Sequence, residues 1–178
     1  SKDPYWQASV RREVLAHPQA GKEIQDECAA CHMPMSRYQA KARGHKGRLF
    51  AHLGARARPT PAGRLADAGV SCAICHQITP EGLGTEESFT GGFEVDTSRP
   101  LGSRTIYGPF EIDSGRQRLM RSSAEFQPEQ GRHVQGSELC ASCHTLYTHT
   151  RGPEGEIVGE LPEQVPYLEW RHSAYEGV

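Results

Sequence analysis

The segment Ser137–His144, with the sequence SELCASCH, contains two cysteines separated by two residues and followed at once by a histidine. The same Cys-x-x-Cys-His pattern occurs at Cys28–His32 and at Cys72–His76, and it uses all 6 cysteines of the chain. Histidine makes up only 9 of 178 residues, so three such followers are expected by chance on the order of once in ten thousand sequences. The repeated pattern therefore indicates one kind of binding site, present three times.

Several chemistries use paired cysteines, and most explain only part of this pattern. Zinc needs four ligands, and three half-sites do not combine neatly into zinc sites. A thioredoxin-like motif needs one Cys-x-x-Cys in a βαβ setting, and disulfides leave the histidines unexplained. Covalent c-type haem explains every residue, because two thiols add to the porphyrin vinyl groups and the adjacent histidine coordinates the iron.

The sequence therefore predicts three covalently attached haem c groups, each with its iron. The attachment residues are the cysteines of the three motifs: Cys28, Cys31, Cys72, Cys75, Cys140 and Cys143. The proximal iron ligands are the three histidines that follow them: His32, His76 and His144.

The composition agrees with an interior filled partly by cofactor. Only 36% of the residues are hydrophobic and 7% aromatic, and the 19 glycines and 12 prolines predict many loops. We therefore predict a mainly α fold with extensive loops and little β, a compact multihaem cytochrome c fold wrapped around three covalently bound haems. Residues 1–178 are expected to form a single trihaem domain or a fragment of a longer multihaem chain.

Charge and hydropathy exclude some partners. The net charge is −2 with acids and bases interspersed, so we expect no nucleic-acid partner. No apolar run approaches the roughly 20 residues of a membrane span. Because haem is attached outside the bacterial cytoplasmic membrane, we expect a periplasmic or cell-surface protein, exported by a signal peptide that this sequence does not include.

Local patterns predict several helices. Asp3 and Pro4 are typical of a helix start, and a helix is expected over Pro4–His17. Further helices are expected over about Lys22–Cys31, near Ser36–Arg43, over Ser137–His144 and over Pro162–Tyr175. A turn of helix in the segment PAGRLADAG should stop at Gly69. The segments ESFTGGFEVD (87–96) and RTIYGPFEID (104–113) alternate apolar residues and predict a short hairpin or extended flaps.

The sixth iron position decides what such a protein does, because an occupied position favours electron transfer and an open one permits catalysis. We predict His17, His133 and His172 as the second axial ligands. His45 and His52 are held in reserve, whereas His149 is too close to His144 in sequence to arch easily over the same ring. Met33 and Met35 are expected to pack against a porphyrin edge, and ligation by Met35 is the alternative.

The chain resembles a known family at three places. The Cys-x-x-Cys-His motifs, WQAS at 6–9 and YLEWRHSAY at 167–175 are similar to multihaem c-type cytochromes related to the tetrahaem electron acceptor of hydroxylamine oxidoreductase, a group that includes octahaem reductases. Members often carry a W-x-x-S-x-H helix whose histidine ligates a haem. Here Tyr175 stands at that position and a histidine appears at 172, so the ligand from this helix is left open between His172 and, as an unusual alternative, Tyr175.

Three functions remain open. The first is electron transfer along closely packed, mostly bis-histidine haems, with redox proteins as donors and acceptors. The second is reduction or oxidation of a small nitrogen or sulfur species at one open haem, with the anion positioned by basic residues: Lys46, His52, Arg56 and Arg58. The third is a subunit of a larger cytochrome assembly or a homo-oligomer. We expect the first, an electron carrier and not an enzyme.

Overall fold

The structure is a computed structural model that describes residues 2–53, 57 and 59–176. It is mainly helical, with 49% helix and 15% strand in small sheets, which confirms the expected mainly α class. No helix within the described ranges combines the length and the apolar character that crossing a bilayer requires. The chain divides into two compact units, one of Ser1–Ser71 with Thr145–Val165 and one of Cys72–His144 with Pro166–Val178.

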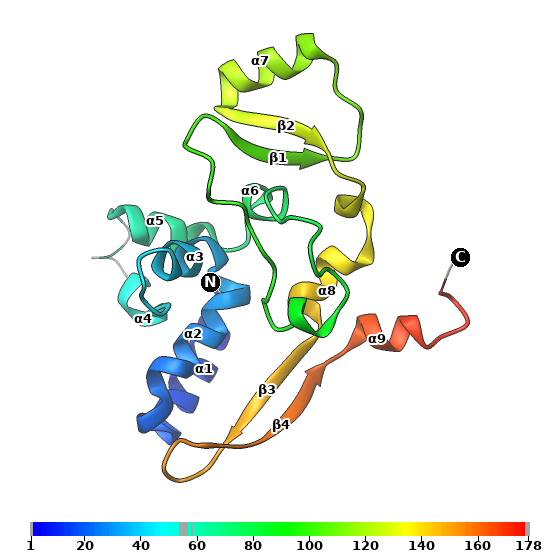
Figure 1. Ribbon diagram of the computed structural model, residues 1–178. Coiled ribbons are helices and arrows are strands. Elements are labelled where there is room, and N and C mark those ends of the chain that lie inside the picture. The colour runs from blue at the N-terminus through cyan, green and yellow to red at the C-terminus, as the bar shows by residue number, and fades with distance from the viewer. Residues whose placement is uncertain (1, 54–56, 58, 177–178) are drawn as a thin grey trace. The chain divides into compact units, whose positions relative to one another are not determined.

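The first unit is built from helices and one β-ribbon (Figure 1). Its helices are α1 (Pro4–Ala16), a 3₁₀ turn (Pro18–Ala20), α2 (Gly21–His32), α3 (Pro34–Lys41), α4 (Leu49–His52) and α5 (Pro61–Ala68). The Asp3 carboxylate caps α1 by accepting from the Trp6 N–H at 2.8 Å. At the other end, Gly69 stops α5 with a φ of +59°, in the left-handed region that glycine tolerates. The predicted helices in this part of the chain are confirmed, with ends shifted by at most two residues.

A small apolar core holds these helices together. Val10, Ala29, Met33, Leu49 and Ala66 are each at most 4% exposed. These side chains come from α1, α2, α4 and α5, and Met33 lies between α2 and α3. The partly buried Cys28 side chain packs against them. The core therefore fixes α2, the helix that carries the first Cys-x-x-Cys-His motif. It also shows that Met33 packs inside the protein.

The ribbon pairs β3 (Leu146–Arg151) with β4 (Ile157–Gln164) in antiparallel register. The expected helix over Pro162–Tyr175 is wrong in its first turn, because the chain stays extended to Gln164 and α9 covers only Pro166–Arg171. Proline lacks an N–H and clashes with the preceding turn inside a helix, so Pro166 can begin this helix but cannot continue one from Pro162.

The second unit contains α-helices, 3₁₀ turns and a two-stranded sheet (Figure 1). They are α6 (Cys72–Cys75), a 3₁₀ turn (Glu86–Ser88), β1 (Arg104–Gly108), α7 (Ser114–Ala124), β2 (Phe126–Gln130), a second 3₁₀ turn (Arg132–Gln135), α8 (Ser137–His144) and α9. Strands β1 and β2 pair in parallel, and α7 connects them. The Asp113 carboxylate starts α7 by accepting from the N–H groups of Gly115 and Arg116.

The hairpin expected between residues 87–96 and 104–113 does not form. Only Arg104–Gly108 becomes a strand, and its partner is Phe126–Gln130. The earlier segment makes a single bridge, Ile78 to Val95. Thr90 and Gly91 both have positive φ values, +55° and +76°, so the backbone turns where a strand would need to stay extended.

Candidate functional site

Each of the three motifs lies on a helical segment. The first ends α2 and the third ends α8. In the second, α6 covers Cys72–Cys75 and the His76 N–H donates to the Cys72 carbonyl at 3.0 Å, which extends the turn to the histidine. Residues three and four apart share a helix face, so both thiols and the imidazole of a motif project from one side. None of the six cysteines, all of which the structure describes, is joined in a disulfide.

The second motif holds its histidine in one orientation. The Nδ1 atom of His76 lies 2.5 Å from the Tyr107 carbonyl oxygen, and the Tyr107 N–H donates to the His76 carbonyl at 2.7 Å. A carbonyl oxygen only accepts hydrogen bonds, so Nδ1 carries a proton, and in the neutral ring Nε2 is the nitrogen with the available lone pair. Ligating histidines commonly donate their other ring N–H in this way, and the arrangement suits Nε2 for iron.

The first motif is partly covered by protein. The His32 ring stacks on Trp6 with 4.3 Å between ring centroids and 27° between planes. Burial lowers the pKa of His32, which favours the neutral imidazole that a metal ligand requires. Burial, followed by the nearby carboxylates of Glu27 and Glu163, raises the pKa of the Cys28 thiol to about 11. Redox-active cysteines have lowered pKa values, so Cys28 lacks the character of a redox nucleophile.

The second and third motifs are neighbours within their unit. Burial raises the pKa of the Cys75 thiol, and the Cys143, Cys140 and Cys72 thiols raise it further. Such an influence requires that the sulfurs of Cys72, Cys140 and Cys143 each lie within electrostatic range of the Cys75 sulfur. The third motif is anchored nearby, since the Gly91 N–H donates to the buried Ser142 carbonyl at 2.7 Å. The structure therefore brings together two motifs separated by more than sixty residues.

The predicted second ligands lie in different settings. His17 caps the end of α1 and is half-buried. The Nε2 of His133 donates to the Ile78 carbonyl at 2.9 Å, and its ring meets Tyr107 edge-on at 4.8 Å. The Nδ1 of the exposed His172 donates to the Leu168 carbonyl at 2.7 Å, which leaves Nε2 free. His172 thus presents Nε2, the usual coordinating atom. In His133 the same atom is engaged, so its hydrogen bond to the Ile78 carbonyl must break before Nε2 can bind iron.

His149, which was not expected to reach its own motif's ring, has an unexpected position. Its Nδ1 lies 3.1 Å from the Glu27 carboxylate, and the Arg151 guanidinium donates to the same oxygen at 2.7 Å. Glu27 immediately precedes Cys28, so His149 lies beside the helix of the first motif. Sequence reasoning considered His149 only in relation to the third motif, because no local signal indicates which helix β3 will contact.

Other sequence candidates have different surroundings. His45 is exposed, and burial followed by the Arg48 charge lowers the pKa of His52. The Met35 sulfur accepts from the Ser71 hydroxyl at 3.1 Å, and Tyr175 is 73% exposed.

Of the basic residues considered for an anion site, the structure describes only Lys46 and His52. Lys46 forms an ion pair with Glu23 at 2.6 Å, which occupies its ammonium group. Arg56 and Arg58 lie outside the described residues.

The donor set fits haem. Within the part of the chain that the structure describes, no three His, Cys, Asp or Glu side chains surround a point where a metal ion could sit. A haem site does not need such a group, because porphyrin nitrogens supply most of the iron ligands and the protein adds one or two. Paired thiols beside a single imidazole match that requirement at each motif.

Comparison with known proteins adds no relative. The chain matches no protein-family model, no curated protein and no solved structure.

Proposed function

We propose that this chain is an electron-transfer c-type cytochrome that carries three covalently attached haems. The thiols of its three Cys-x-x-Cys pairs form the thioether bonds, and His32, His76 and His144 are the proximal ligands. When bound, haem supplies one-electron chemistry through its ferric and ferrous states. The polypeptide contributes attachment, axial ligation and the surroundings that set the reduction potentials.

The orientation of His76 carries this proposal. A surface histidine gains nothing from a fixed tautomer, whereas a metal ligand needs one ring nitrogen free and the other held. His76 has its Nδ1 held by the Tyr107 carbonyl and follows two free thiols on one helical turn. This is the arrangement that thioether attachment and axial ligation together require.

Electron transfer is favoured over catalysis by the closeness of two motifs. The thiols of the second and third motifs raise the pKa of Cys75, so the cofactors attached there would be neighbours. Neighbouring haems exchange electrons without a substrate pocket. Haem would also supply apolar surface to a chain with few large apolar residues, since the polypeptide would wrap the porphyrin faces.

We propose histidine as the second ligand at most of the irons, with His17, His133 and His172 as the candidates. His172 is the most available, because its Nε2 is free and exposed. A protein of this kind would exchange electrons with other redox proteins through small, weak contacts at exposed haem edges, in the periplasm or at the cell surface.

Mass spectrometry, absorption spectra and electron paramagnetic resonance together test the proposal. The mass of the purified chain should exceed the polypeptide mass by three haems. Absorption and electron paramagnetic resonance of the oxidised protein should show low-spin iron that added nitrite or cyanide does not change. A high-spin signal that shifts with added ligand would instead indicate an open haem and favour the enzyme. A chain without covalent haem would refute the proposal altogether.

A further inference from the structure

Helix α7 is unusual in burying none of its residues. Its sequence, SGRQRLMRSSA, contains arginines and no acidic residue, in a chain whose net charge is −2. Leu119 is 69% exposed and Met120 is 42% exposed. A helix on the surface of a globular protein normally packs an apolar stripe against the core. α7 instead presents apolar and cationic side chains together to solvent.

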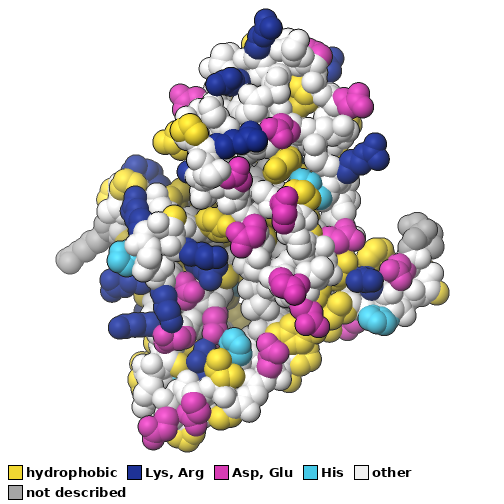
Figure 2. Space-filling model, in the orientation of Figure 1, with side chains coloured by type: hydrophobic (Ala, Val, Ile, Leu, Met, Phe, Trp, Pro, Cys, Tyr) yellow, Lys and Arg dark blue, Asp and Glu magenta, His cyan; other side chains and the backbone are white. Residues whose placement is uncertain are grey.

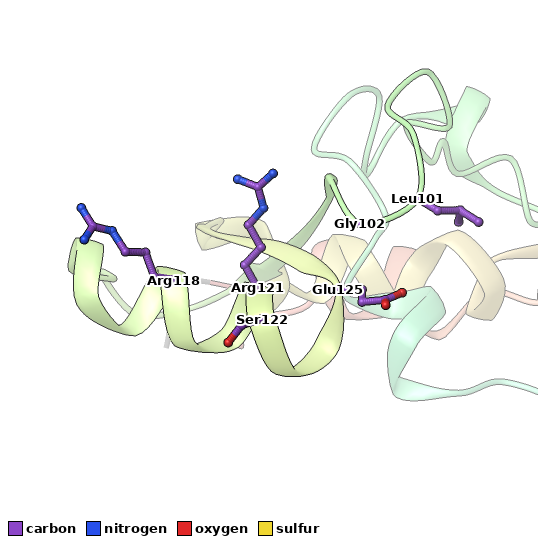
Figure 3. A pocket seen from close by; sticks show the side chains of 6 residues that line it. All are labelled: Leu101, Gly102, Arg118, Arg121, Ser122 and Glu125. Atoms are coloured by element: carbon purple, nitrogen blue, oxygen red, sulfur yellow. The ribbon is translucent and has the colours of Figure 1, made fainter.

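This helix borders an open hollow of about 470 Å³, which we name the basic groove. It is lined by Leu101, Gly102, Arg118, Arg121, Ser122 and Glu125. Figure 3 shows Arg118 and Arg121 projecting from α7, with Leu101 on a neighbouring loop. Leu101 is 82% exposed, so the groove combines two guanidinium groups and one carboxylate, a net positive charge, with an uncovered apolar side chain.

Strand β4 has the complementary character. Every one of its residues is exposed, including the apolar side chains of Ile157, Val158 and Leu161 at 56–61%. Glu160 and Glu163 make the strand acidic. β4 pairs with β3 in a two-stranded sheet, so its other edge presents backbone groups that can pair with another chain. Figure 2 shows hydrophobic and acidic side chains along this ribbon and Lys and Arg side chains over α7.

We propose that the basic groove of one copy of this chain binds strand β4 of a second copy. The charges are opposite, and both surfaces expose apolar side chains that association would cover. Because the groove and the strand are different surfaces, the contact is heterologous, and each associated pair keeps one free groove and one free strand. Such contacts produce rings or open chains of copies.

The two kinds of interaction have different roles. Exposed ion pairs contribute little affinity individually but orient the partners and speed their encounter. The apolar residues supply most of the affinity through burial. Because screening shortens the range of charge interactions from about 10 Å in 0.1 M salt to about 3 Å in 1 M salt, association should weaken as salt rises. This proposal does not depend on the haem content of the chain.

Sedimentation of the full chain tests the pairing, from about 5 to about 500 µM at low and high salt. The average mass should rise with concentration at low salt. The groove variant Arg118→Glu/Arg121→Glu and the strand variant Glu160→Arg/Glu163→Arg should each raise the dissociation constant at least about tenfold. The controls Arg12→Glu and Glu86→Arg reverse exposed charges elsewhere and should leave it within about twofold.

Mixing the two variants is the decisive step. The unaltered strand of the groove variant meets the unaltered groove of the strand variant, so association should return on mixing. This result also shows that both variants are folded. A wild-type chain of single-copy mass at every concentration would overturn the proposal. So would variants that fail to restore association when mixed, or a groove variant that dissociates the assembly while the strand variant does not.

Discussion

The Nδ1 atom of His76 and the carbonyl oxygen of Tyr107 lie 2.5 Å apart, although 31 residues separate them in sequence. The contact joins a helical turn that carries two thiols to strand β1, and the Tyr107 N–H returns a hydrogen bond to His76. The tautomer of the second motif's histidine is therefore set by a backbone group, which no side-chain substitution at position 107 removes.

Two variants of this motif should separate attachment from ligation. Cys72→Ala/Cys75→Ala removes both thioether bonds, so the mass of the purified protein should fall by one haem. His76→Ala keeps the thiols and removes the ligand, so the mass should stay at three haems while one iron becomes high-spin. Mass spectrometry and electron paramagnetic resonance distinguish the two results. An unchanged mass for the double variant would contradict the assignment.

The second-ligand histidines should each affect one iron. Replacing His17, His133 or His172 by Ala should convert about one third of the iron from low-spin to high-spin, because each removal opens one sixth position. His45→Ala, at an exposed histidine held in reserve, is the matched control. Paramagnetic resonance of the oxidised variants measures the fraction. If His45→Ala opens an iron and His172→Ala does not, the assignment of His172 is wrong.

The Cys28 thiol should react slowly before haem attachment. Its pKa of about 11 leaves little thiolate at pH 8, so we expect alkylation at least about tenfold slower than at the exposed Cys72 and Cys140 thiols. The rate should climb until the pH approaches 11. Residue-resolved mass spectrometry after timed alkylation measures these rates, and equal rates at Cys28 and Cys72 would contradict the burial.

The raised pKa of Cys28 also predicts how the stability of the folded chain depends on pH. The folded-state pKa of Cys28 lies above the unfolded value of about 8.5, so folding favours the protonated thiol. Its contribution to stability is fully present below pH 8.5 and is lost as the pH rises toward about 11. Denaturant unfolding of the haem-free chain across this range, compared with Cys28→Ala, measures the effect.

Gly131 should not tolerate a side chain. A Cβ atom there would lie 2.6 Å from His133 Cε1 and 2.9 Å from Tyr107 Cδ1, which forces the two rings apart. We expect Gly131→Ala to destabilise the protein by about 1–3 kcal/mol through this overpacking. Gly108→Ala is the control, because nothing lies within 4 Å of a Cβ at that position. Thermal unfolding compares them, and equal losses would show that the crowding is absent.

Glu27 should matter more than Glu23 on the same helix, because its partner Arg151 is buried and the partner of Glu23, Lys46, is exposed. The Arg151 side chain is only 9% exposed and donates to Glu27, so Glu27→Ala leaves a buried guanidinium without this partner. We expect a loss of about 1–3 kcal/mol. Glu23→Ala removes an exposed pair with Lys46 and should cost at most about 1 kcal/mol. Denaturant unfolding measures both, and a larger loss for Glu23→Ala would reverse the ranking.

Several features could be predicted because their causes lie within one or two helical turns. The Asp3 cap, the proline at the start of α1 and the Gly69 stop of α5 were readable from neighbouring residues, and those helices formed. The start of α7 was missed, although Asp113 before an arginine- and leucine-containing run is a recognisable cap signal. The three Cys-x-x-Cys-His motifs belong to the same class, since the two cysteines and the histidine of each fall within five consecutive residues.

The sequence by itself thus determined the mainly α class and the Cys-x-x-Cys-His chemistry that the proposed function rests on. Tertiary structure alone decided that β1 pairs with β2 across α7, that His149 lies against Glu27 and that the second and third motifs are neighbours. It also decided that β4 and α7 are left exposed. The physical reason is that strand partners and burial depend on contacts between distant segments, which local propensity does not encode.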